Sequence, residues 1–160
     1  MAGTSGDGEP ITAQGLQALR AEIGQLETVA RREVAARILT ARGHGDLKEN
    51  AEYHAAKEDQ AHLETRIMRL RQRLRNAVVV DAADADGALF AFGRSAEVRD
   101  EGTGEVQTWT IVGAAEADRA RGRLSAESPV ARALLDQPVG AAVQVDTPRG
   151  TRRLTIVRVL

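Results

Sequence analysis

The chain contains no cysteine, and aromatic residues make up only 2% of its 160 residues. Without thiols it can form neither disulfides nor cysteine-ligated zinc sites, and thiolate catalysis is excluded. Because aromatic rings are so scarce, its cores must be built mainly from Leu, Val, Ile and Ala. A chain of this length forms one or two domains, each with a modest core.

Long apolar runs are also missing. No run approaches the roughly 20 residues that cross a bilayer, so we expect no membrane segment. The first nine residues are rich in glycine and carry two acids but no basic or apolar region. That composition is unlike a signal peptide and typical of a disordered tail, which we place at residues 1–10. We expect a cytoplasmic protein. The net charge of −1 argues against strong non-specific DNA binding.

What the chain does have is two helical repeats, over the region 11–80. Apolar residues in both repeats step by three and four, the pattern of a coiled-coil seam. The first seam is Leu16, Leu19, Ile23, Leu26, Ala30, Val34 and Ile38. The second is Tyr53, Ala56, Gln60, Leu63, Ile67, Leu70, Leu74 and Ala77. Thr12 is the expected N-cap of the first helix. Gly43 and Gly45 allow a tight reversal between the seams, which predicts an antiparallel hairpin roughly 45 Å long.

The rest of the chain has a different periodicity. Residues 81–88 are small and acidic and read as a linker. The region 89–160 predicts a small antiparallel β domain with one short helix, so the fold class is α+β. Ser128 is the expected N-cap of that helix, with Pro129 at its first position. Strands are expected over 96–99, 106–112, 143–146 and 153–159.

The turn of the hairpin carries two carboxylates, Asp46 and Glu49, far from any core. Carboxylates at the end of a long hairpin indicate that the hairpin carries them into a site on another molecule. The same Asp-x-x-Glu spacing is also a capping-box pattern, in which both side chains serve the start of a helix. Spacing alone leaves both interpretations open.

The run Gly45-Asp46-Leu47-Lys48-Glu49-Asn50-Ala51-Glu52-Tyr53 resembles the tip signature of the Gre family of bacterial transcript cleavage factors. The match continues through residues 54–58, and residues 128–135 are similar to the family's C-terminal domain. The resemblance spans 11–160 and implies an FKBP-like fold for the region 89–160. It also implies a partner, bacterial RNA polymerase, whose secondary channel the hairpin enters so that backtracked RNA is cut to a new 3′ end. The chain itself is then not an enzyme.

The resemblance implies that Asp46 and Glu49 hold Mg²⁺ jointly with carboxylates of the polymerase. Two carboxylates three residues apart on one helical face can hold a weakly bound ion, but they are too few for a strong site alone. Asn50, Tyr53 and Lys48 are supporting residues of the tip. Asn50 can orient water or substrate, Tyr53 can equally pack in the seam, and Lys48 can touch RNA phosphate or lie solvated.

A second set of residues is assigned to docking on the polymerase. Glu116 and Asp118 resemble an acidic loop of the family, although Ala115 stands where the family often has a further acid. Ser128, Pro129 and Arg132 belong to the segment that the resemblance assigns to gripping the polymerase. The alternative for that segment is a capped helix that closes a small β core.

Three other functions stay open. The same fold can occupy the channel and pause or inhibit the polymerase without cleavage. A peptidyl-prolyl isomerase follows only from the implied FKBP-like fold and needs an aromatic-lined pocket. A structural coiled-coil dimer is the third, whereas a cleavage factor is expected to be a monomer. The three histidines do not have zinc-site spacing.

Overall fold

The computed structural model describes residues 8–82 and 86–160. These residues form two compact units. One is Leu16–Ala77, and the other combines Val78–Leu160 with the chain up to Gly15. Most of the expected tail, residues 1–7, and part of the expected linker, residues 83–85, lie outside the described residues. No helix of the described chain is long and apolar enough to cross a membrane.

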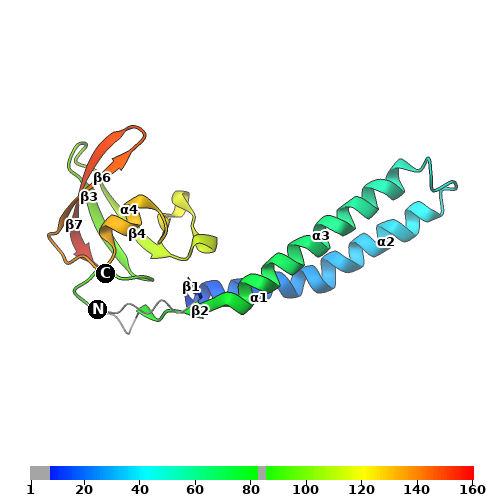
Figure 1. The fold of residues 1–160 in the computed structure, drawn as a ribbon, viewed down its shortest axis with the longest axis horizontal. Helices are drawn as coiled ribbons and strands as arrows, with labels where there is room; N and C mark the ends of the chain where they lie inside the picture. The colour runs from blue at the N-terminus through cyan, green and yellow to red at the C-terminus, as the bar shows by residue number, and fades with distance from the viewer. Residues whose placement is uncertain (1–7, 83–85) are drawn as a thin grey trace. The chain divides into compact units, whose positions relative to one another are not determined.

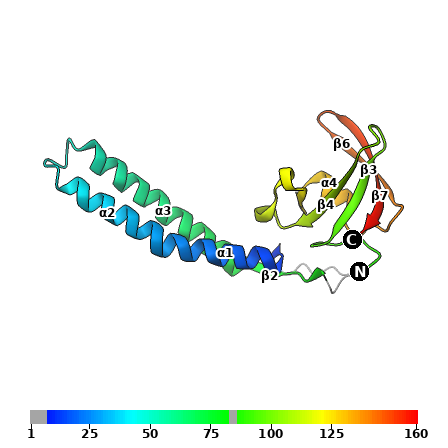
Figure 2. The same cartoon turned by 180° about the vertical axis from the view of Figure 1, so that it is seen from behind.

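The first unit is a helical hairpin. Its first arm consists of α1 (Ala13–Gln25), the π-helical turn η1 (Leu26–Ala30) and α2 (Arg31–Arg42), and its second arm is α3 (Ala51–Asn76). Figures 1 and 2 both show α2 and α3 side by side up to the turn that joins them. All residues of the two predicted seams are buried or half-buried. The predicted hairpin is therefore confirmed.

Ion pairs join the two arms along the outside of the seam. Arg31 donates two hydrogen bonds to Glu64, at 2.8 and 2.9 Å, and the bonded guanidinium holds the pKa of Glu64 below its ordinary value. Further pairs between the arms are Arg37–Asp59, Arg66–Glu22 and Arg71–Glu27. Because these pairs are exposed, each adds little stability. Their alignment nonetheless favours one register of the two arms.

The second unit contains a five-stranded sheet in the order β5-β4-β3-β7-β6. Its strands are β3 (Ser95–Asp100), β4 (Val106–Val112), β5 (Arg123–Ser125), β6 (Ala142–Thr147) and β7 (Gly150–Val159). The expected purely antiparallel sheet is corrected in one place, because β5 pairs with β4 in parallel. The short helix α4 (Pro129–Leu134) begins as predicted, since the Ser128 hydroxyl accepts a hydrogen bond from the Ala131 amide.

The core of this unit lies between the sheet and α4. Phe90, Ile111, Leu134, Leu154 and Ile156 are fully buried there. Trp109 is nearly buried, its indole nitrogen donates to Gln107, and the Arg152 guanidinium lies 5.9 Å from its ring centre. Two of the chain's few aromatic residues therefore build this core.

The chain before α1 was expected to be disordered up to residue 10. Instead β1 (Glu9–Ile11) pairs with β2 (Ala77–Val79). Thr12 then caps α1 as predicted, accepting from the Gly15 amide at 3.0 Å. The Thr12 amide and hydroxyl both donate to the carboxylate of Glu116, which lies beyond β4 in the 3₁₀ turn η3 (Ala114–Glu116). These bonds and the pairing of β1 with β2 attach the chain up to Gly15 to the second unit.

Two glycines of α1 make a matched pair for measuring these contacts. A Cβ on Gly24 meets nothing within 4 Å, whereas one on Gly15 lies 2.1 Å from Glu116 Oε1. Gly24→Ala should therefore raise the free energy of unfolding by about 1 kcal/mol, the difference in helix propensity. Gly15→Ala should lower it by about 1–3 kcal/mol, because Glu116 must leave its partners. Urea unfolding followed by circular dichroism measures both. Equal effects of the two substitutions contradict the close approach of Glu116.

Candidate functional site at the hairpin tip

Residues 43–50 connect α2 to α3 and form the tip of the hairpin. Gly45 has a φ of 109°, a backbone conformation that side-chain-bearing residues rarely adopt. Gly43 and His44 continue the end of α2, donating to the carbonyls of Thr40 and Ala41 at 3.1 Å. Gly45 therefore serves the reversal as predicted, whereas Gly43 keeps a helical φ of −70° and does not supply the expected positive angle.

The helix that follows is capped by Asn50. Its side-chain oxygen accepts a hydrogen bond from the Tyr53 amide at 3.0 Å, and its backbone is extended, as an N-cap requires. The same side chain donates from Nδ2 to the Ala41 carbonyl at 2.6 Å. Asn50 is therefore bonded to the ends of both arms. The sequence suggested that this amide was available to water or substrate, and in the structure both of its ends are engaged.

Asp46 and Glu49 lie before α3, because that helix starts at Ala51. The expectation that they share one helical face is therefore wrong, and so is the capping-box alternative. Asp46 instead accepts from the Lys48 amide at 3.0 Å, a local turn that leaves its second oxygen outside this bond. Both carboxylates and Lys48 are exposed. The acids are thus presented to solvent at the tip.

The remaining tip contacts involve aromatic and histidine side chains. Tyr53 is half-buried at the start of the seam, and its ring meets His54 edge-on at 5.6 Å. His54 Nε2 lies 3.2 Å from the Lys48 carbonyl, and His44 lies 3.7 Å from Glu52. Tyr53 therefore packs, as one of its two interpretations held. His54 is a contributor to the tip that sequence spacing did not reveal.

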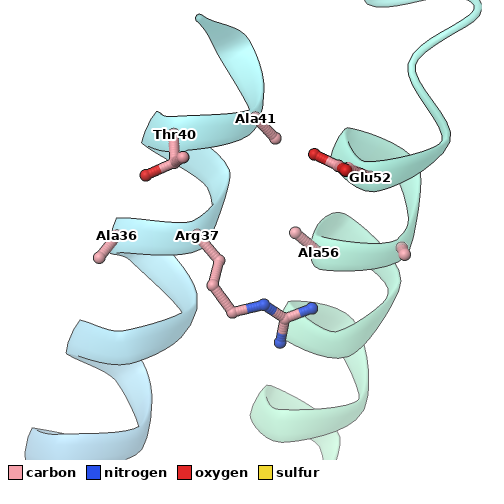
Figure 3. Close-up of a pocket in the computed structure, with 7 residues that line it drawn as sticks. Ala36, Arg37, Thr40, Ala41, Glu52 and Ala56 are labelled. Atoms are coloured by element: carbon pink, nitrogen blue, oxygen red, sulfur yellow. The ribbon is translucent and has the colours of Figure 1, made fainter. Parts of the chain in front are cut away.

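A groove of about 420 Å³ lies between α2 and α3 just below the tip. Figure 3 shows Arg37 reaching across it from α2, and Glu52 on α3 facing Ala41. Its lining is otherwise small: Ala36, Thr40, Ala41, Ala55 and Ala56. The groove follows from the seam itself, which is built from Ala41 and Ala56 at this end. The tip is accordingly slender.

The tip does not form a complete metal site. In the described parts of the chain, no three His, Asp or Glu side chains are grouped as ligands. Asp46 and Glu49 nevertheless offer exposed carboxylate oxygens, the ligand type that Mg²⁺ prefers. Such a pair fits an ion whose other ligands come from elsewhere, and it does not fit a site that this chain fills alone.

The residues predicted to dock differ in their surroundings. The Glu116 side chain is only 6% exposed. Besides Thr12, its carboxylate accepts from the Gly113 amide at 3.0 Å and lies 3.7 Å from Arg123. Asp118 is more open, and it caps the 3₁₀ turn η4 (Arg119–Arg121) by accepting from the Ala120 amide. The acidic loop thus holds one inward and one outward carboxylate.

Strand β5 places two groups of predicted docking residues at the edge of the sheet: the acidic loop with Asp118 and the segment that starts at Ser128. Asp118 exchanges backbone hydrogen bonds with Arg123 at the start of β5. Ser128 follows the end of β5, bonded to the Ser125 carbonyl, and starts α4. Pro129 and Arg132 are exposed on that helix. The capped helix closes the core, as one interpretation of this segment held, and the docking role of its exposed residues stays a prediction.

Residues 9–79 match the family model for the N-terminal domain of transcription elongation factors GreA and GreB, and residues 87–160 match the model for their C-terminal domain. Transcription elongation factor GreA of Rhodopseudomonas palustris (strain BisA53) is 45% identical over 150 residues, covering 94% of both chains. That of Methylococcus capsulatus is 46% identical over 151 residues, covering 94% of this chain and 96% of the relative.

Solved structures give a weaker likeness. The crystal structure of GreA factor homolog 1 of Thermus thermophilus is 25% identical and covers 96% of this chain and 99% of that chain, with a TM-score of 0.44. The two family models together span both units, and the curated relatives match nearly end to end. The chain therefore belongs to the GreA/GreB family of transcription elongation factors.

Proposed function

We propose that this chain stimulates cleavage of backtracked RNA by bacterial RNA polymerase. In this proposal the hairpin enters the secondary channel, and the tip places Asp46 and Glu49 beside the polymerase's active site. The polymerase performs the cleavage, and this chain is not an enzyme by itself.

One observation carries the proposal. Asp46 and Glu49 are exposed at the extreme of the hairpin, and neither serves as a helix cap, because Asn50 does. Exposed at the end of a slender hairpin, the two acids contribute nothing to a core. Their position is explained if their charge is used on another molecule.

A divalent cation is the simplest partner for these two carboxylates. Mg²⁺ held jointly by these two carboxylates and by carboxylates of the polymerase would activate water and stabilise the displaced oxygen. This chain's part is to supply negative oxygen ligands at a fixed place, with Lys48 beside them to limit the local negative potential. The incomplete ligand set of the tip supports sharing.

Docking is assigned to the edge of the sheet around β5, where Asp118, Pro129 and Arg132 are accessible. Glu116 is a poor candidate for direct contact, because its carboxylate is bonded within the chain. We therefore assign to Glu116 the internal role of holding the start of α1, and to Asp118 the charged contact.

The rival functions make different use of the same residues. The two exposed acids at the tip argue against a regulator that occupies the channel without cleavage. A prolyl isomerase needs aromatic rings that line a pocket, but Phe90 is fully buried and Trp109 nearly so. Cleavage of RNA in stalled elongation complexes, with and without the chain, tests the proposal directly. Unchanged cleavage together with altered pausing supports the regulator instead.

Asp46→Asn separates charge from structure, because asparagine can still accept the hydrogen bond from the Lys48 amide. Cleavage stimulation should fall by about tenfold or more, equivalent to about 1.4 kcal/mol in the barrier. Glu49→Gln should behave in the same way. A Mg²⁺ titration of the cleavage rate should show a smaller defect at high Mg²⁺, because weaker ligation raises the concentration required. A defect that stays constant across the titration contradicts a metal-holding role.

Asp118→Asn and Glu116→Gln separate docking from folding. Asparagine caps η4 as well as aspartate, so Asp118→Asn should leave the free energy of unfolding within about 0.5 kcal/mol and weaken binding to the polymerase. Glu116→Gln turns an amide donor toward buried donors and should cost about 1–3 kcal/mol of stability. Urea unfolding and competition binding measure the two quantities. Weaker binding by folded Glu116→Gln, with Asp118→Asn unaffected, reverses the assignment.

A further inference from the structure

The Asn50 side chain is the feature of the tip that the proposed function does not use directly. Its two hydrogen bonds, to Tyr53 at 3.0 Å and to Ala41 at 2.6 Å, join the start of α3 to the end of α2. We infer that Asn50 is a positioning residue, whose amide fixes the span of the tip and thereby the place of Asp46 and Glu49. This inference rests on the proposed function.

The chemistry of the two partners determines which way the amide faces. A backbone N–H only donates and a backbone carbonyl only accepts, so Oδ1 must face Tyr53 and Nδ2 must face Ala41. A carboxylate at position 50 can accept from the Tyr53 amide but cannot donate to the Ala41 carbonyl. A hydroxyl is too short to reach both groups. Asparagine supplies both the acceptor and the donor. If only the helix cap were needed, serine or aspartate would serve equally well.

The bond to Ala41 closes the tip loop. Ala41 is 3% exposed and belongs to the seam, so its carbonyl is a fixed point on α2. Only residues 42–49 lie between the two bonded residues, and within them the Lys48 amide donates to Asp46 while the Lys48 carbonyl lies 3.2 Å from His54. Without the bond to Ala41, the loop keeps its internal bonds, its two helix ends and the contacts of His44 with Glu52 and of Lys48 with His54. A wider range of loop conformations then becomes accessible.

Removal of this bond should affect the chemistry more than it affects binding. The docking residues lie in the other unit, so affinity for the polymerase should not change. The carboxylates, however, must be held to within a fraction of an ångström to act on a shared site, and displacement by about 1 Å can cost up to about 100-fold in rate. The inference thus predicts a loss at saturating concentrations of the factor.

Asn50→Ser tests the inference in the full-length protein. Serine keeps the cap on α3 but loses the donor to Ala41. Ile67→Val is the control, because it removes one methylene from a fully buried seam residue about 25 Å along α3 from the tip. It should cost about 0.5–1.5 kcal/mol of hairpin stability without touching the loop. The affinity, the cleavage rate at saturating factor and its Mg²⁺ dependence are measured for the parent and both variants.

We expect Asn50→Ser to bind as the parent does and to cleave about tenfold more slowly at saturation, with a higher Mg²⁺ requirement, while Ile67→Val cleaves as the parent does. Parental cleavage by Asn50→Ser overturns the inference. Equal losses in both variants also overturn it, since they indicate hairpin stability alone.

Amide hydrogen exchange distinguishes this inference from the proposed function. If the parent itself does not stimulate cleavage, the proposed function fails, and exchange at residues 45–49 decides whether Asn50 orders the tip. Faster exchange there in Asn50→Ser, with the Tyr53 amide still protected, supports the structural role. Unchanged exchange overturns it.

Discussion

The apolar seam between the two arms of the hairpin is the interaction on which the presentation of the tip depends. Its residues step by three and four on both arms, so each arm offers one continuous stripe, and burial of the two stripes against each other sets the register. Arg31–Glu64 and the other ion pairs add alignment rather than much stability. With the register set, Ala41 and Asn50 come to lie opposite one another. The tip loop can then be closed by a single side chain.

Closure by one amide resolves a conflict at the tip. The first turn of a helix needs an acceptor for its free amides, and Asp serves as well as Asn or Ser. An acid used in that way is folded back on the backbone and has less capacity to act on another molecule. Because Asn50 supplies the acceptor, Asp46 and Glu49 remain exposed. Because neutral Asn50 caps the helix, the charged Asp46 and Glu49 are left for the proposed chemistry.

The parts of the structure that follow from periodicity were predictable. Both seams lie where the pattern places them, since burial on one face leaves a direct trace in the sequence. The strand β4 also has its expected bounds, 106–112, which its β-branched and aromatic residues indicate. The N-cap of α3 was harder, because Asp46 and Asn50 both suit an N-cap and only the exact start of the helix decides between them. The position of the two acids at the tip was recovered, but not their place relative to the helix.

Contacts between distant segments left no such trace. Glu116 is bonded to Thr12, more than a hundred residues earlier in the chain, and nothing near either residue indicates the other. The parallel pairing of β5 was missed for a related reason: three residues are too short for a periodic signal, and the strand is specified by its partner β4. The family resemblance placed Glu116 and Asp118 in one acidic loop, but it did not show that their side chains face different surroundings.

The bonds between Thr12 and Glu116 also bear on the order in which the chain passes through its two compact units. The chain passes from one compact unit into the other after Gly15 and returns at Val78. The hairpin is therefore an insertion within a discontinuous domain, and not a separate module that precedes it. In a growing polypeptide, β1 can pair with β2 as soon as the hairpin has been made, whereas Thr12 gains its bonds to Glu116 only after β4 has followed.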